Sequence, residues 1–291
     1  MARGKNINLY LMDGDVNGRV KCTLANWTGL AFKIPRTKLA SCKDREELKQ
    51  AGVYFLFGKD DDISEQSVVY IGQACIRKNG EGLYNRLQEH DKNPEKDYWN
   101  EAIAITTSNN SLGPTEISYL EHRFCKLANE VNRYTVKNGN DPNPGNPSEE
   151  KISELEDFID YSKIIVGTLG HKVFVPLVDK EGTSSVETRN EELKCTRSGI
   201  KAFGERTSDG FVVKKGSKVQ LTPTTTCPPS ATKRREQYGR FIDKDGVLMK
   251  DLLFNTPSGA SDFVCLASTN GNDEWKNHND VKLKDLLKKG V

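Results

Sequence analysis

Two short runs of β-branched and aromatic residues in the first third of the chain constrain its fold more than any other feature. They are VYFLF at 53–57 and VVYIG at 68–72, and the acidic stretch 58–66 separates them. Apolar runs of this length, bounded by glycine and acidic residues, are typical of buried or half-buried strands. We therefore expect the two runs to form one hairpin inside a sheet.

Helical patterns and further strands surround this hairpin. Residues 83–90 have leucines four positions apart, and residues 116–131 have apolar positions that recur at three and four, as on one face of a helix. Strand-like segments lie at 8–12, 20–34 and 102–106. The sequence therefore predicts an α/β (α+β) N-terminal domain, in which a small mixed sheet is flanked by helices.

A stretch rich in proline and asparagine at 139–147 marks the clearest break in the chain. Ser148 can cap a helix that follows this break, and a polar segment at 179–195 is typical of a linker. We expect the helix to connect two halves of the chain. The expected divisions are a β-hairpin extension over 1–50, a first domain over 51–140, the connecting helix over 148–170 and a small, basic α+β domain over 195–291.

The composition excludes several classes of protein. Hydrophobic residues make up 35% of the 291 residues and charged residues 29%, and no apolar run approaches the roughly 18 residues of a membrane span. The seven cysteines are odd in number and none forms a CxxC pair, so neither a disulfide framework nor a zinc ribbon is expected. We expect reduced thiols, a cytoplasmic location and no membrane partner.

Positive charge is concentrated in one part of the C-terminal half, although the net charge of the whole chain is only +2. Residues 195–240 contain ten basic and three acidic residues. Such a stretch can bind a phosphate backbone by releasing counterions, and the simpler alternative is a solvated surface that keeps the domain soluble. The candidate nucleic-acid contacts are Lys214, Lys215, Lys218, Lys233, Arg234 and Arg235.

Five polar residues of the first domain can together form a phosphodiester site: Tyr54, Tyr70, Arg86, His90 and Glu121. The arginine and the histidine are four positions apart and share one helix face. A carboxylate can hold a hard cation such as Mg²⁺, an arginine fork fits phosphate oxygens, and a tyrosine or histidine can position or deprotonate water. Each residue taken alone has an ordinary structural explanation, so the hypothesis depends on the whole set.

At these residues the chain resembles the GIY-YIG nuclease superfamily. GVY at 52–54 matches the first motif and YIG at 70–72 the second, and the order continues with Arg86 and Glu121. The resemblance extends over about residues 50–135. It implies a strand–strand–helix–strand–helix domain that hydrolyses nucleic-acid phosphodiesters.

The resemblance also implies a role for each residue. Tyr54 would be the general base or would position the water, and Tyr70 would hydrogen-bond at the scissile phosphate. Arg86 would stabilise the developing negative charge, and His90 would assist proton transfer or hold phosphate. Glu121 would be the sole protein ligand of one Mg²⁺ or Mn²⁺ ion in the active site.

Three features depart from the pattern of the family or match it in more than one way. The family has an asparagine downstream of the glutamate, for which Asn132 is the nearest match and Asn129 and Asn138 are rivals. Val53 stands where the first motif usually has isoleucine, which changes one methylene group. The acidic connection at 58–66 would repel a DNA backbone near it, so we expect it either to face away from the substrate or to form an exposed hairpin tip.

The C-terminal part resembles a small domain of unknown function that is often appended to GIY-YIG nucleases. GFVVKKGSKV at 210–219, the basic run at 233–235 and the segment 256–275 carry this resemblance. From its basic residues we expect this domain to bind a substrate or partner.

The sequence therefore predicts a divalent-metal-dependent endonuclease that hydrolyses DNA, with RNA as the open alternative. A second hypothesis is a catalytically idle module that keeps the fold and binds nucleic acid or protein. The structure of the DNA substrate and the oligomeric state stay open at this stage.

Overall fold

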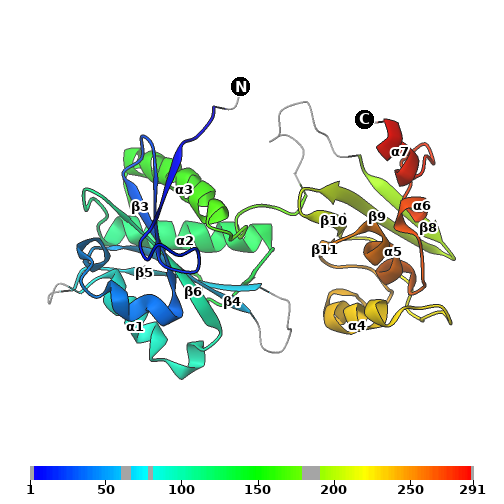
Figure 1. Ribbon diagram of the computed structural model, residues 1–291, viewed down its shortest axis with the longest axis horizontal. Helices are drawn as coiled ribbons and strands as arrows, with labels where there is room; N and C mark the ends of the chain where they lie inside the picture. Colours follow the sequence, from blue (N-terminus) through cyan, green and yellow to red (C-terminus); the bar gives the residue numbers. More distant parts are fainter. Residues whose placement is uncertain (1–2, 60–66, 78–80, 179–190, 290–291) are drawn as a thin grey trace. The chain divides into compact units, whose positions relative to one another are not determined.

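The computed structural model describes residues 3–59, 67–77, 81–178 and 191–289. The chain divides into two compact units, Met1–Pro176 and Leu177–Val291 (Figure 1). Each unit has its own sheet and its own helices, so the expectation of a mixed α/β protein with a second, small sheet is confirmed. The acidic residues 60–66 and most of the expected linker, 179–190, lie outside the described residues.

A seven-stranded sheet forms the centre of the first unit. Its strand order is β1-β2-β3-β6-β4-β5-β7, and the strands are antiparallel except for the parallel pair β5–β7. The strands are β1 (Ile7–Leu11), β2 (Val20–Leu24), β3 (Gly29–Pro35), β4 (Gly52–Lys59), β5 (Ser67–Ala74), β6 (Trp99–Thr107) and β7 (Thr135–Val136). The helices are α1 (Leu83–Asp91), α2 (Pro114–Val131) and α3 (Glu149–Thr168), with short 3₁₀ turns at Arg36–Cys42, Glu46–Lys49 and Pro94–Lys96.

The N-terminal segment is part of this sheet, which differs from the extension expected over 1–50. Strands β1, β2 and β3 form a meander, and β3 pairs along its whole length with β6, from Gly29 opposite Thr107 to Pro35 opposite Glu101. Central strands must pair on both sides, and β6 pairs with β3 on one side and β4 on the other. The first unit therefore begins with the first strand and not at residue 51.

The two faces of the sheet bury two separate cores, because side chains alternate along each strand. On β4, Val53, Phe55 and Phe57 belong to the core beneath α2 and α3. Tyr54 and Leu56 belong to the core beneath α1. Tyr54, the tyrosine of the first predicted motif, is therefore on the face of the sheet that α1 covers.

The second half of β5 lies near an open edge of the sheet, where the two faces meet. β7 pairs with β5 only at Val68 and Val69. Beyond this point α2 lies against β5, and the Ser118 hydroxyl of α2 donates to the Gln73 side chain of β5 at 3.2 Å. Side chains from α2 can therefore approach groups from the opposite face around this edge.

Helix α3 packs on the first unit, which corrects the expectation of a connecting helix over 148–170. Its apolar stripe, including Phe158 and Val166, joins the core that α2 covers, and the Phe158 ring lies 5.1 Å from that of Trp27. Ser148 caps it as expected, its hydroxyl accepting from the Lys151 amide. No helix in the described ranges is long and apolar enough to cross a membrane.

A four-stranded antiparallel sheet forms the second unit, in the order β11-β10-β9-β8. Phe211, Phe263 and Trp275 are buried in its core, with the Phe211 and Trp275 rings 4.6 Å apart. The strands are β8 (Leu193–Arg197), β9 (Ile200–Thr207), β10 (Gly210–Val213) and β11 (Leu252–Phe254). The helices are α4 (Pro229–Tyr238), α5 (Pro257–Cys265), α6 (Gly271–Glu274) and α7 (Leu283–Lys289), with a 3₁₀ turn at Gly239–Phe241.

Candidate active site

Tyr54 lies in the middle of β4 and is fully buried. Its hydroxyl oxygen lies 2.6 Å from Nε2 of His90, in the last turn of α1. Gly72 is directly opposite Tyr54 in the β4–β5 register, and a Cβ atom on Gly72 would lie 2.3 Å from the Tyr54 hydroxyl oxygen. The glycine that ends the second motif therefore makes room for the tyrosine that ends the first.

Three rings form a compact cluster at this point. The ring centroids of Tyr54 and Tyr70 are 6.2 Å apart, and those of Tyr54 and His90 are 5.3 Å apart. The Tyr70 and His90 centroids are 5.2 Å apart. Tyr70 is only partly buried, whereas His90 is 4% exposed, so Tyr70 is the member of the cluster that meets solvent.

Burial determines the protonation states of the Tyr54–His90 pair. Burial, together with the charges of Lys96 and Arg86, lowers the pKa of His90 to about 3. Burial also raises the pKa of Tyr54 far above its usual value, with Tyr70 adding to this and Arg86 opposing it. At neutral pH the pair is therefore a neutral phenol and a neutral imidazole that are joined by one hydrogen bond. A neutral, buried His90 is suited to proton exchange and not to holding a phosphate.

Arg86 lies one turn before His90 on α1 and is the main positive charge of the cluster. Its Nη1 is 2.6 Å from the Glu89 carboxylate, whose other oxygen is 2.5 Å from Arg77. Burial lowers the pKa of Arg86, but the hydrogen bonds with Glu89 and Tyr54 outweigh this and the net shift is upward. The guanidinium side chain is 38% exposed, so it can meet a phosphate from solvent.

Glu121 approaches the same cluster from α2, past the open edge of β5. Burial raises the pKa of its carboxyl group, while a hydrogen bond from Gln73 and the charge of Arg86 lower it. Arg86 and Glu121 both influence the pKa of Tyr70, in opposite directions. Arg123, two residues on, pairs with Glu156 at 2.6 Å instead. Glu121 is thus a partly buried carboxylate without an ion pair among the described residues.

A divalent cation fits this carboxylate. Mg²⁺ prefers oxygen ligands and is usually held by one or two carboxylates, while waters and substrate phosphates complete its shell. Within the described ranges no three His, Cys, Asp or Glu side chains converge to form a closed protein site. Glu121 could supply one carboxylate ligand to such a cation, and the positive charge would offset the cost of burying the carboxylate.

Asn138 lies next to the cluster in the structure, whereas the spacing in the sequence favoured Asn132. Asn132 ends α2 in the left-handed conformation, with φ of 52°, and its side chain is exposed. The Asn138 side chain instead accepts from the Ile71 N–H at 3.0 Å and donates to the Ile71 carbonyl at 2.6 Å. Asn138 thus continues the pairing of β7 with a side chain and holds β5 between Tyr70 and Gly72.

Sequence reasoning missed Lys96, which lies in the short turn after α1. Its ammonium group is 3.3 Å from the centroid of the Tyr70 ring. Burial, together with the charge of Arg86, lowers the pKa of Lys96 to about 8. No motif marks this lysine, and only the return of the chain after α1 brings it to the cluster.

The basic residues expected to bind nucleic acid differ in their surroundings. Lys214 pairs with Glu192 at 2.9 Å and with Glu205 at 3.2 Å. Arg235 donates to the Phe263 carbonyl and lies over the same phenyl ring, at 4.5 Å. Burial lowers the pKa of Arg235 to about 10. These two residues stabilise the second unit.

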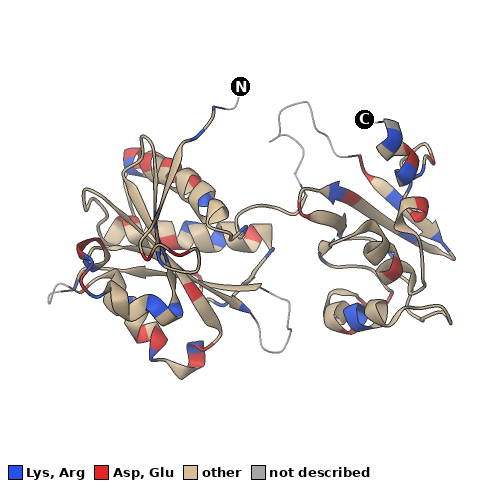
Figure 2. Ribbon diagram, in the orientation of Figure 1, with Lys and Arg blue, Asp and Glu red and all other residues tan. Residues whose placement is uncertain are grey.

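The other four residues of this set are more accessible. Lys215, Lys218 and Lys233 are exposed, and Arg234 is half-buried, with its guanidinium 5.9 Å from the ring of Phe254. Figure 2 shows ribbon segments of basic and of acidic residues interspersed along the second unit. The basic stretch of the sequence is therefore not one uninterrupted positive surface.

Residues 193–287 match a protein-family model described as a domain of unknown function (DUF4357). The expected resemblance of the C-terminal part to a domain of unknown function is thus confirmed. No curated protein and no solved structure matches the chain. The GIY-YIG resemblance of the first unit stays a prediction.

Proposed function

We propose that the first unit is a divalent-metal-dependent endonuclease that hydrolyses DNA phosphodiester bonds. The observation that carries this proposal is the Tyr54–His90 hydrogen bond of 2.6 Å inside a cluster that includes Tyr70, Arg86 and Glu121. Four elements supply these groups: β4, β5, α1 and α2. A buried acid–base pair beside an arginine and a lone carboxylate supplies groups that can catalyse phosphodiester hydrolysis.

The Tyr54–His90 pair would accept the proton of the attacking water. Because burial disfavours a free Tyr54 phenolate, the water proton would pass to the Tyr54 oxygen as the Tyr54 proton passes to Nε2 of His90. This concerted transfer keeps the phenol neutral and leaves His90 as an imidazolium, which its burial disfavours and which the negative charges of the phosphate and of Glu121 would stabilise. The adjacent exposed faces of Tyr70 and Arg86 would hold the phosphate that the water attacks.

Arg86 would stabilise the charge that develops on the phosphate oxygens, since a guanidinium fork matches their geometry. A cation at Glu121 would supply Lewis-acid stabilisation of the phosphate and the leaving oxygen. Lys215, Lys218 and Lys233 of the second unit are exposed and would contact the DNA backbone through their charge.

The Tyr54→Phe protein is expected to lose about 10²- to 10⁴-fold in cleavage rate, which is the usual contribution of a positioned acid or base. DNA affinity should change little, because the hydroxyl is buried. The measurement is single-turnover cleavage of labelled duplex, single-stranded and branched DNA with Mg²⁺ or Mn²⁺, beside a binding assay on the same substrates.

Tyr84→Phe is the matched control. Tyr84 lies in the same core and hydrogen-bonds Gln88 at 2.8 Å, but it belongs to no part of the cluster. Equal losses in both variants would contradict the role of Tyr54. A wild-type protein that binds DNA but cleaves none of the substrates would favour the idle nucleic-acid-binding module.

Lys96 predicts an alkaline limit to this activity. Its ammonium group is charged below a pKa of about 8 and neutral above it, and Arg86, Tyr70 and His90 surround it. If it contacts the substrate phosphate, kcat/KM should fall as the pH rises through about 8. Lys96→Arg should remove this fall, because arginine stays protonated.

Lys96→Met should lower kcat/KM about tenfold or more at pH 7, since hydrogen bonds to charged groups contribute about 1.5–3 kcal/mol. A pH profile measured with all three proteins tests the assignment. The same alkaline fall in Lys96→Arg and in the wild type would show that another group is responsible.

A further inference from the structure

Strand β1 leaves one edge of the seven-stranded sheet open. Within the described residues β1 pairs only with β2. Its sequence INLYL contains no charge and no proline, and Leu9, Tyr10 and Leu11 are 49%, 62% and 39% exposed. Natural edge strands are normally protected by charges, prolines or bulges, because an open edge binds other strands. An apolar, unprotected edge therefore points to a strand partner.

The backbone groups on this open edge can be identified from the ladder with β2. The Asn6 carbonyl accepts from the Ala25 N–H, and the Met12 N–H donates to the Arg19 carbonyl. Hydrogen-bonded and non-hydrogen-bonded pairs alternate in an antiparallel ladder. The N–H and C=O groups of the intervening odd-numbered residues, Ile7, Leu9 and Leu11, therefore point away from β2.

We propose that this edge pairs with β1 of a second copy of the chain, antiparallel and about a two-fold axis at Leu9. In this register Leu9 faces Leu9 of the second copy, and Ile7 faces Leu11 of the second copy. Each of these pairs can exchange two N–H···O=C bonds, because all three residues present both groups outward. The edge is thus complementary to itself, as a two-fold interface requires.

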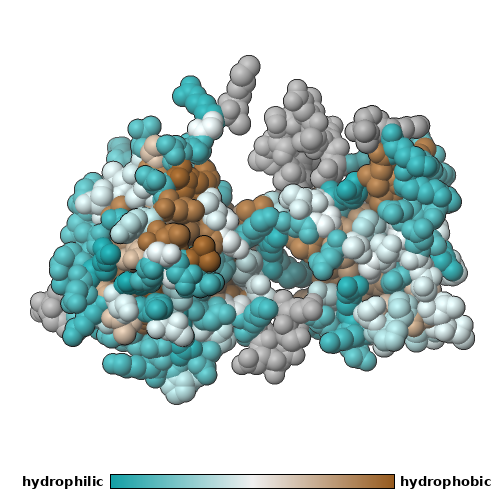
Figure 3. All heavy atoms as spheres, in the orientation of Figure 1, coloured by the Kyte–Doolittle hydropathy of each residue, from teal (hydrophilic) through white to brown (hydrophobic). Residues whose placement is uncertain are grey.

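The side chains of this edge extend an apolar face. Ile7, Leu9 and Leu11 are opposite Leu24, Cys22 and Val20, which are buried in the core beneath α3. The side chains of Ile7, Leu9 and Leu11 therefore lie on the face of the sheet that α3 covers. Figure 3 shows hydrophobic atoms gathered on the first unit over the region of β1 and α3.

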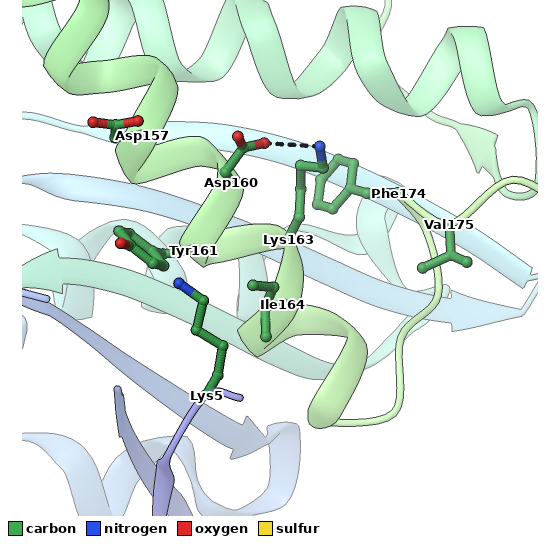
Figure 4. A pocket seen from close by; sticks show the side chains of 8 residues that line it. All are labelled: Lys5, Asp157, Asp160, Tyr161, Lys163, Ile164, Phe174 and Val175. Carbon is green, nitrogen blue, oxygen red and sulfur yellow. Dashed lines mark hydrogen bonds and ion pairs between the residues drawn. The ribbon is translucent and has the colours of Figure 1, made fainter. Parts of the chain in front are cut away.

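A hollow of about 510 Å³ lies on the same side, at the Lys5 end of the strand. Lys5, Tyr161, Ile164 and Val175 line it (Figure 4), and the Lys5 ammonium lies 4.6 Å from the centre of the Tyr161 ring. The proposed register brings Leu11 of the second copy next to this end.

This interface would leave the candidate active site accessible in both copies. β1 and β5 lie at opposite ends of the strand order, separated by β2, β3, β6 and β4. The inference goes beyond the proposed function and does not depend on it. It concerns only the association of the first unit.

The test measures the mass of the full chain in solution by sedimentation and light scattering. The wild-type protein is expected at twice 32.6 kDa, or 65.2 kDa. Leu9→Lys should weaken the dimer at least about 100-fold, because like charges facing each other cost several kcal/mol. Leu9 is half-exposed, so the monomer should stay folded, which circular dichroism checks.

An equimolar mixture of the Leu9→Lys and Leu9→Glu proteins should regain the dimer, because opposite charges would then meet at the axis. Val16→Lys is the matched control, since Val16 is 75% exposed and lies outside the strand, and it should stay dimeric. A monomeric wild type, a dimeric Leu9→Lys protein or a mixture that stays monomeric would each overturn the proposal.

Discussion

Glu121→Gln is expected to abolish metal-dependent cleavage while leaving DNA binding and folding nearly unchanged. The amide keeps the shape of the side chain and can still accept the hydrogen bond from Gln73. It removes the negative charge that a divalent cation needs. Lewis-acid stabilisation contributes several kcal/mol, so we expect a loss of at least about 1,000-fold in the cleavage rate.

The direction in which Glu121→Gln changes the free energy of unfolding follows from the pKa of Glu121. Burial raises the pKa of Glu121 in the folded protein, so the charged carboxylate costs stability at any pH above its unfolded pKa. Replacing it by a neutral amide removes this cost. The free energy of unfolding without metal should therefore be equal to or slightly above that of the wild type at pH 7.

Metal binding gives a readout that does not depend on activity. Mg²⁺ or Mn²⁺ should raise the Tm of the wild type by mass action on the folded state, and should raise that of Glu121→Gln much less. Glu130→Gln is the matched control, because Glu130 is an exposed glutamate on the same helix. A full metal-induced Tm shift in Glu121→Gln would contradict the ligand role.

Gly72→Ala is expected to disrupt both the site and the sheet around it. The new Cβ would lie 2.3 Å from the Tyr54 hydroxyl oxygen and 2.4 Å from the carbon that carries it. Tyr54 is fully buried between neighbouring strands, so its ring cannot move without displacing the hydrogen bond to His90. We expect a loss of about 1–3 kcal/mol in the free energy of unfolding, the usual cost of overpacking a core, and a loss of cleavage as large as that of Tyr54→Phe.

Gly167→Ala is the matched control for this substitution. Gly167 lies in α3, and nothing lies within 4 Å of a Cβ atom built on it. Alanine should therefore stabilise the helix by about 0.5–1 kcal/mol relative to glycine and leave cleavage unchanged. Chemical denaturation and the cleavage assay on both variants measure the two effects. A Gly72→Ala protein with wild-type stability and activity would show that Tyr54 is not confined as described.

The hairpin of β4 and β5 and the stripe of α2 could be predicted from local patterns. Unbroken apolar runs read as central strands, and the buried positions of α2, such as Ile117, Leu120 and Phe124, recur at helical spacing. The length of the sheet could not be predicted in this way. β3 pairs with β6, far along the chain, and no short-range pattern specifies a partner at that separation.

The helix over 149–168 shows the same limit. Its cap at Ser148 is a local signal and was predicted correctly. Its apolar stripe indicated that one face is buried, but not against which core. The rings of Trp27 and Tyr161, 6.2 Å apart, show that it covers the first unit, where a connecting arm was expected.

The sequence by itself determined which residue types are available to the candidate site: Tyr54, Tyr70, Arg86, His90 and Glu121 follow one another in a fixed order and on elements that local periodicity predicts. Only the tertiary structure decided how they act. Burial, which depends on every neighbour in space, makes His90 a neutral partner of Tyr54.

Tertiary contacts also decided which other residues join the cluster. They bring Lys96 onto the Tyr70 ring and Asn138, not Asn132, onto the β5 backbone. The same contacts turn Lys214 and Arg235 from free cations into structural ones. A linear pattern encodes chemical identity and local geometry, whereas desolvation and electrostatic coupling arise only when distant segments pack together.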